Sequence, residues 1–176
     1  MFKRLLILLL LLMVAGLAAA RAETAMTVMV YLCGSNLETD AGAASADLAE
    51  MMEHIPADGS VRVIVMPSGS RQWQSDVSPR ETAIYELTGA GLEKQCALPL
   101  QSMGDPAALT ALLDYGYAHA PARQYALVLW DHGAGPAIGL CFDELFLEDD
   151  GMDGLTLPEL SRALAEELFG EEKALI

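Results

Sequence analysis

The residues best suited to chemistry lie at the end of one apolar run. Tyr125–Trp130 carries no charge, and the chain then changes abruptly to Asp131-His132-Gly133-Ala134-Gly135. Histidine titrates near neutrality, so an imidazole at a strand end can take a proton from a thiol or hydroxyl and return it to a leaving amine. Gly133 lets the backbone approach a substrate, and its amide can donate to a developing oxyanion. His132 is therefore a candidate base, although position alone is equally compatible with an ordinary histidine at a strand end.

A histidine base needs a nucleophile, and two cysteines are candidates. Cys141 follows His132 closely along the chain, and Cys33 follows the first predicted strand. For each, the alternative is a small, semi-buried thiol with no chemical role, which is the commoner fate of a cysteine. His54 and His119 lie at the ends of predicted helices, where surface or capping roles are expected.

An acidic run after Cys141 offers hard oxygen ligands that could hold calcium. Its members are Asp143, Glu144, Glu148, Asp149, Asp150 and Asp153. Counted from Asp149, Gly151 and Leu160 stand at the third and twelfth positions, where an EF-hand loop has ligands. A solvated acidic loop is therefore the better prediction. The sequence also has no zinc spacing, no P-loop and no GxGxxG after the first strand.

Composition limits the class of protein. With 176 residues, 53% of them hydrophobic and 20% charged, the chain can form one domain with a substantial core. Ten basic residues stand against 25 acidic ones, a net charge of −15. This charge repels phosphate, so no nucleic-acid partner is predicted. It favours cationic ligands, although acidity also simply keeps an exported protein soluble, which is the commoner explanation. Three cysteines cannot all pair within one chain, which leaves one bridge with a free thiol or three free thiols.

The amino terminus has the three parts of an export signal. Residues 2–4 include two basic side chains, Leu5–Val14 is apolar, and residues 18–20 are three alanines. The apolar run is shorter than the roughly 20 residues of a membrane span. We predict a signal peptide over residues 1–20, cleaved after Ala20 or Ala22. The mature domain, residues 24–176, would then be extracellular or in the cell envelope, without membrane contact.

Hydrophobic periodicity predicts alternating strands and helices. Strands are expected at residues 27–32, 61–66 and 125–130, with a hairpin within residues 71–100 that includes a strand at 83–87. Helices are expected at residues 40–55, from Asp105 to about 120, and from 157 to about 169. This alternation is typical of an α/β sandwich with a mainly parallel sheet. Ligands would then lie beyond the carboxyl ends of the strands, at residues 34–36, 67–70 and 131–135.

Five segments, in this order, resemble the clostripain-like cysteine peptidases. They are MVYLCGSNLE, VIVMPSGSRQW, MGDPAALTALLDYG, YALVLWDHGAGP and LTLPELSRALAE. The resemblance covers almost the whole mature chain and implies a caspase-like three-layer α/β/α sandwich with a mainly parallel central sheet. It also implies a cysteine-histidine dyad in which His132 is the histidine and Gly133 contributes its amide to the oxyanion hole. Asn36 matches a position that lines the substrate pocket.

The family's nucleophilic cysteine follows the next core strand, beside the acidic residue that sets a preference for arginine or lysine. Lys173–Ile176 resembles the start of that strand, so the chain is expected to be truncated before the nucleophile, and Cys141 does not match the nucleophile's position. Ala134 and Pro136 replace the glycine and the aromatic residue that often follow the histidine.

The resemblance therefore implies the amino-terminal part of an exported endopeptidase that cleaves after basic residues and acts as a monomer. This part alone would be inactive. The chemistry needs no cofactor, although some members depend on calcium or cleave themselves, and the acidic run is where either would occur. Two alternatives stay open: a non-catalytic caspase-like module that binds cationic peptides, and catalysis by Cys141 itself.

Overall fold

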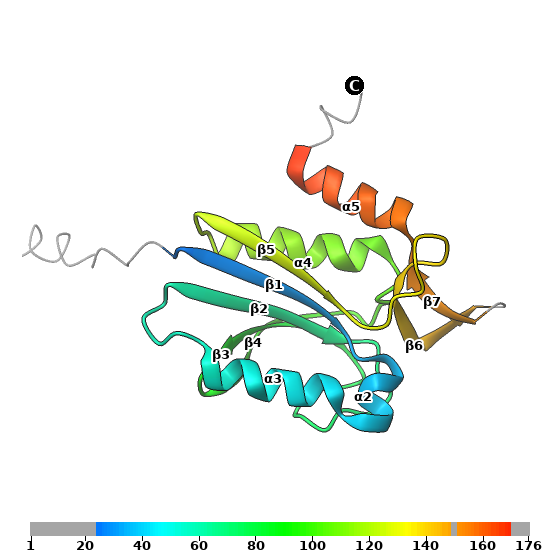
Figure 1. The fold of residues 1–176 in the computed structure, drawn as a ribbon, viewed down its shortest axis with the longest axis horizontal. Coiled ribbons are helices and arrows are strands. Elements are labelled where there is room, and N and C mark those ends of the chain that lie inside the picture. The colour runs from blue at the N-terminus through cyan, green and yellow to red at the C-terminus, as the bar shows by residue number, and fades with distance from the viewer. Residues whose placement is uncertain (1–23, 149–150, 170–176) are drawn as a thin grey trace, which may run out of the picture.

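The structure is a computed structural model that describes residues 24–148 and 151–169. Its central sheet has five strands in the order β4-β3-β2-β1-β5. Their bounds are β1 Met26–Cys33, β2 Val61–Ser68, β3 Thr82–Thr88, β4 Gly91–Leu98 and β5 Gln124–Trp130. Helix α3 (Ala43–His54) covers one face, and α4 (Pro106–His119) covers the other with α5 (Leu157–Phe169) packed beside it (Figure 1). The predicted α/β/α sandwich is confirmed.

The remaining elements lie around the carboxyl edge of the sheet. They are the short helix α2 (Ser35–Ala41) and a separate hairpin of β6 (Leu140–Glu148) and β7 (Gly151–Leu155). None of the helices in the described part of the chain is both long and apolar enough to span a membrane. The predicted signal peptide and the predicted strand at Lys173–Ile176 lie outside the described residues.

Parallel pairing in the middle of the sheet brings three strand ends to one edge. β1 lies between β2 and β5 and pairs in parallel with both, so that Leu32 stands opposite Pro67 on one side and Trp130 on the other. β3 and β4 form the predicted hairpin, antiparallel to each other, and β3 pairs antiparallel with β2. The sheet is therefore mixed, and its parallel centre places the residues after β1, β2 and β5 side by side.

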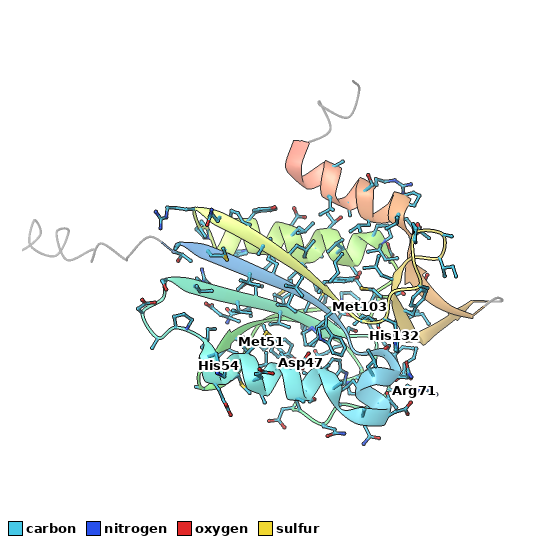
Figure 2. All side chains as sticks on the ribbon, viewed as in Figure 1. Asp47, Met51, His54, Arg71, Met103 and His132 are labelled. Atoms are coloured by element: carbon cyan, nitrogen blue, oxygen red, sulfur yellow. The ribbon has the colours of Figure 1, made fainter. Side chains whose placement is uncertain are left out.

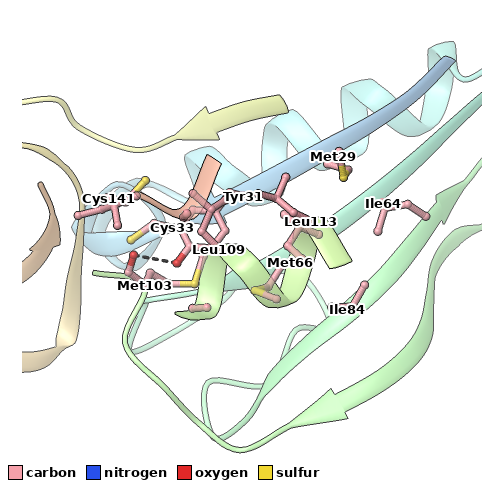
Figure 3. Packing of buried hydrophobic residues seen from close by; sticks show 14 of the residues in the cluster. Met29, Tyr31, Cys33, Ile64, Met66, Ile84, Met103, Leu109, Leu113 and Cys141 are labelled. Atoms are coloured by element: carbon pink, nitrogen blue, oxygen red, sulfur yellow. Dashed lines mark hydrogen bonds between the residues drawn. The ribbon is translucent and has the colours of Figure 1, made fainter. Parts of the chain in front are cut away.

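Alternate residues of the central strands enter two separate cores. On the α4 side, Tyr31 and Ile64 pack with Leu109, and Tyr31 also donates its hydroxyl hydrogen bond to Met103 O at 2.8 Å (Figure 3). On the α3 side, Val30 and Leu48 belong to the second cluster. Burial on both faces explains why β1 and β2 are mostly apolar, as in Val28–Leu32 and Val63–Met66.

The predicted helix over residues 40–55 is observed as α3, and the short helix α2, which was not predicted, precedes it. Gly42 has φ +65°, which interrupts the helical conformation, and its amide closes α2 by donating to Glu38 O at 2.8 Å. The segment SNLETDA has a single large apolar side chain, Leu37, so periodicity did not predict α2. In contrast, α4 begins as predicted, with Asp105 Oδ1 accepting a hydrogen bond from Ala107 N at 2.9 Å.

The acidic segment differs from the predicted solvated loop. Most of it forms the β6–β7 hairpin, in which Asp143 is 0% and Glu144 5% exposed. Both carboxylates are buried because hydrogen-bond donors from other segments surround them, which compensates the loss of water. Asp149 and Asp150 lie outside the described residues.

A buried carboxylate, Glu38, fixes α2 in place. It is fully buried and accepts hydrogen bonds from Ser45 N at 2.8 Å, Ser45 Oγ at 2.6 Å and Gln74 N at 2.7 Å. Through these bonds one side chain joins α2, α3 and the loop after β2. α2 carries Asn36 in its first turn, so Glu38 also determines where that side chain lies.

Replacing Glu38 with glutamine is expected to lower the free energy of unfolding by about 2 kcal/mol, because an amide NH2 then faces backbone donors with no acceptor. Urea unfolding followed by circular dichroism measures the change. Glu50→Gln is the matched control, since Glu50 lies exposed on α3 and its substitution should change stability by less than about 0.5 kcal/mol. Equal effects of the two substitutions would contradict this role for Glu38.

Candidate active site

His132 lies at the carboxyl edge of the sheet, two residues after β5, with its side chain exposed. Figure 2 shows it near α2, at the opposite end of the sheet from His54. The Nε2 atom of His132 is 3.1 Å from Oδ1 of Asn36. Two residues predicted for the site from separate segments are therefore in direct contact. Asn36, expected to line a substrate pocket, touches the imidazole itself.

This contact determines which ring nitrogen of His132 is available. With Asn36 Oδ1 as the acceptor, Nε2 must carry the hydrogen, because a carbonyl oxygen only accepts. In the neutral ring the hydrogen on Nε2 leaves Nδ1 with a lone pair. In this tautomer the exposed ring would offer Nδ1 as a proton acceptor.

Gly133 lies in a tight turn that leads from His132 to β6. It forms an isolated antiparallel bridge with Leu140, and the neighbouring Ala134 N donates to Gly139 O at 2.9 Å. In this pattern the bridged pair does not exchange hydrogen bonds, so the Gly133 N–H points away from Leu140. A Cβ atom at Gly133 would meet nothing within 4 Å, which shows open space beside this backbone. The amide is accessible to a bound group.

The structure places the two candidate nucleophiles in the interior. Cys33 and Cys141 are both fully buried and belong to the core cluster on the α4 side (Figure 3). Burial, followed by the nearby charge of Asp131, raises the pKa of Cys141 to about 12 and raises the pKa of Cys33 well above its usual value. Both thiols therefore stay protonated at neutral pH and are poor nucleophiles.

Cys96 is also far from the imidazole. It lies on β4, at one edge of the described sheet, whereas His132 follows β5 at the other edge. Four strand spacings of about 4.8 Å each separate the two edges by roughly 19 Å. No cysteine in the described part of the chain is thus placed to serve His132 as a nucleophile.

At the same edge of the sheet, an ion pair between the buried Glu144 and the exposed Arg71 joins β6 to the loop after β2, and Thr39 adds α2. Glu144 accepts hydrogen bonds from Arg71 N at 2.7 Å and Arg71 Nη2 at 2.8 Å, and also from the Thr39 hydroxyl. Burial alone would raise the pKa of Glu144, but these hydrogen bonds and the guanidinium charge hold it below its usual value. Sequence reasoning missed this cluster because its partners are far apart in the chain.

Neither buried carboxylate of the acidic segment fits a calcium ligand. Asp143 accepts hydrogen bonds from Met103 N and Leu145 N, at 2.9 and 2.8 Å, and burial raises its pKa. Glu144 is already occupied by Arg71 and Thr39. Within residues 24–148 and 151–169, no group of three or more His, Cys, Asp or Glu side chains could hold a metal ion.

The other two histidines behave as predicted for residues at helix ends. His54 and His119 are exposed. The Nδ1 atom of His54 is 2.9 Å from Glu50 O, and the His119 ring stacks on Tyr115 with centroids 4.5 Å apart. Neither lies at the edge of the sheet that carries His132.

Comparisons with known proteins agree on one family and one fold. The sequence profile described as "Clostripain family" matches residues 30–173. A search of curated proteins gives no match. The structure of a secreted C11 cysteine protease from Bacteroides thetaiotaomicron, in complex with an irreversible peptide inhibitor, is 19% identical with a TM-score of 0.57. That match covers 80% of this chain and 39% of the protease chain.

Two further structures resemble the chain to a similar degree. A secreted C11 cysteine protease from the same species, "iotapain", is 18% identical with a TM-score of 0.58, covering 83% of this chain and 43% of that chain. A B. fragilis cysteine protease is 21% identical with a TM-score of 0.51, and the match covers 63% of this chain and 91% of that chain. At these identities the likeness shows the fold, and it confirms the expected caspase-like architecture. The chain spans less than half the length of the two B. thetaiotaomicron proteases.

Burial predicts how the three thiols react. In the native protein at pH 7.5, iodoacetamide should modify the half-buried Cys96 and leave Cys33 and Cys141 unmodified, because a protonated interior thiol is neither nucleophilic nor accessible. Peptide mapping by mass spectrometry, before and after denaturation in urea, measures the labelling of each cysteine. Rapid native labelling of Cys141 that disappears in His132→Ala would instead support Cys141 as a nucleophile.

Proposed function

The chain belongs to the clostripain family, whose profile spans residues 30–173, and we propose that the full-length protein is an exported cysteine endopeptidase that cleaves after arginine or lysine. One observation carries the proposal: the exposed His132 is held by Asn36 at the carboxyl edge of the sheet, with one ring nitrogen open. The similar solved structures are cysteine proteases, which makes a thiol the expected partner of this base.

The proposed reaction uses His132 first as a base and then as an acid. The Nδ1 atom accepts the proton of a cysteine thiol, and the thiolate attacks the peptide carbonyl carbon. The Gly133 N–H donates to the oxyanion that forms. The imidazolium then returns the proton to the leaving amine as the carbon–nitrogen bond breaks, and water hydrolyses the thioester. No step requires a cofactor.

The nucleophile is proposed to come from outside these 176 residues. Support comes from the burial of Cys33 and Cys141 and from the position of Cys96 at the far edge of the sheet. The chain also spans 39% of a related protease, which leaves much of such a protein beyond the matched part. On this proposal the 176-residue chain alone has no peptidase activity, because it carries the base without its thiol.

Charge and predicted targeting support the proposed substrate and location. The net charge of −15 attracts cationic peptides, in agreement with cleavage after basic residues. Two of the similar proteases are described as secreted, and residues 1–20 have the pattern of an export signal. We propose that the enzyme acts outside the cytoplasm as a monomer.

Removing the base should abolish cleavage. In the full-length protein, His132→Ala is expected to lower kcat/KM for a peptide with arginine before the cleaved bond by at least about 10³-fold, the loss typical of a general base. Release of a fluorogenic group measures the rate, with His54→Ala as the matched control because His54 is an exposed histidine far from the site. A full-length wild-type protein that binds arginyl peptides without cleaving them would favour the peptide-binding module instead.

The contact between Asn36 and His132 should matter for the rate. Asn36→Ala removes the acceptor that holds Nε2–H, so the imidazole can rotate or change tautomer, and kcat is expected to fall roughly 10-fold. Steady-state kinetics separates this role from substrate binding: a rise in KM at constant kcat would assign Asn36 to the substrate pocket. Asp40→Ala, at another exposed position of α2, is the control and should leave both constants unchanged.

A further inference from the structure

The residue before the histidine, Asp131, joins three segments of the site. Its Oδ1 accepts a hydrogen bond from Ser35 Oγ and its Oδ2 accepts one from Phe142 N, both at 2.5 Å. Ser35 follows β1 and Phe142 lies in β6, while Asp131 itself follows β5. One carboxylate thus connects the ends of two neighbouring parallel strands to the hairpin beyond them.

Both hydrogen bonds are made in turns where the backbone has an unfavourable conformation. In the described part of the chain, the non-glycine residues with positive φ are Ser35, at +43°, and Cys141, at +57°. Such values are sparsely populated by residues with a side chain and persist only where surrounding contacts hold them. Ser35 is one donor to Asp131, and Cys141 directly precedes the other donor, Phe142. The carboxylate therefore stabilises two strained turns at once.

These two turns carry the groups proposed to act in catalysis. Ser35 directly precedes Asn36, and Asp131 directly precedes His132, so the hydrogen bond between Ser35 and Asp131 sets the separation of the two backbones that form the 3.1 Å contact. The second hydrogen bond fixes β6, whose first residue, Leu140, is bridged to Gly133. The orientation of the imidazole and of the Gly133 amide thus depends on the same side chain.

We propose that Asp131 is a positioning residue: it aligns His132 with Asn36 and Gly133 by bracing two strained turns, and it does so through hydrogen bonds rather than through its charge. The inference rests on the proposed peptidase function for its kinetic consequence. The structural consequence, a less ordered turn at residues 131–142 without the carboxylate, is independent of any activity.

Two substitutions of Asp131 separate the effect of its hydrogen bonds from the effect of its negative charge. Asparagine can keep both hydrogen bonds, because its oxygen accepts from Phe142 N and its NH2 group donates to Ser35 Oγ, a hydroxyl that also accepts. Alanine loses both. In the full-length protein, Asp131→Ala should lower kcat about 10²-fold with little change in KM, the cost of a misplaced catalytic group, whereas Asp131→Asn should stay within about 3-fold of wild type.

Hydrogen–deuterium exchange supplies the readout that needs no activity. Amides in residues 131–142 should exchange at least about 10-fold faster in Asp131→Ala and at the wild-type rate in Asp131→Asn. If the wild-type protein cleaves no peptide, the proposed function fails while exchange still decides the role of Asp131. Ser35→Ala removes one of the two hydrogen bonds. Its amide exchange in residues 131–142 and its kcat should lie between those of wild type and Asp131→Ala. It replaces Asp131→Ala as the test variant if that protein does not fold.

Asp143→Ala is the matched control, because Asp143 is a second aspartate of this region that accepts two hydrogen bonds, from Met103 N and Leu145 N. Rates are normalised to active sites titrated with an arginyl electrophile, so that loss of folded protein does not count as loss of rate. The control should retain kcat within about 3-fold. An equal fall in the control, or an equal fall in Asp131→Asn and Asp131→Ala, would overturn the proposal.

Discussion

The parallel register between β1 and β5 is the constraint on which the site depends. Leu32 pairs with Trp130, so the two chains leave the sheet at the same level and continue as Cys33–Asn36 and Asp131–Gly133. Because side chains alternate between faces, a slip of one residue would reverse which face each one meets and would move His132 along the edge by one residue. Burial of β1 on both faces opposes such a slip, since each side chain would then enter the core on the opposite face, where the close packing fits a different side chain. The contact between Asn36 and His132 is thus set by packing well inside the sheet.

Carboxylates that are buried or half-buried then organise the loops at that edge. Glu38, Asp131 and Glu144 each accept a hydrogen bond from at least one backbone amide of another segment. Loop amides have no strand or helix partner, and leaving them buried without an acceptor costs a few kcal/mol each. Carboxylate side chains provide these amides with acceptors in the irregular loops at this edge of the sheet. The acidity of the protein therefore has a structural part in addition to its effect on solubility and on cationic ligands.

How much the sequence predicts depends on how far apart the interacting residues lie. The strands of the central sheet, α4 and α5 follow from periodicity and capping, which are local, and the place of His132 and Gly133 follows from the abrupt end of an apolar run. Glu144 shows the opposite case: its partners Arg71 and Thr39 are 73 and 105 positions away, so nothing near Glu144 indicated that its carboxylate would be buried and paired. The same holds for Asp131 and its donor Ser35, 96 positions apart. The fold and the position of His132 at a strand end could be predicted, but the network of side chains around His132 could not.

The two interior cysteines show why proximity in sequence is a poor guide to a dyad. The turn between His132 and Cys141 is short, yet its bridge from Gly133 to Leu140 sends the chain into β6, where the Cys141 thiol enters the core. His132 stays exposed on the other side of that turn. In the proposed reaction, a histidine aligned by Asn36 and an open Gly133 amide form one preorganised half of the centre, and preorganisation of this kind lowers the cost of reaching the transition state. A thiol that reaches this edge from the rest of the protein would thus meet a base already in position, without rearrangement of the sheet.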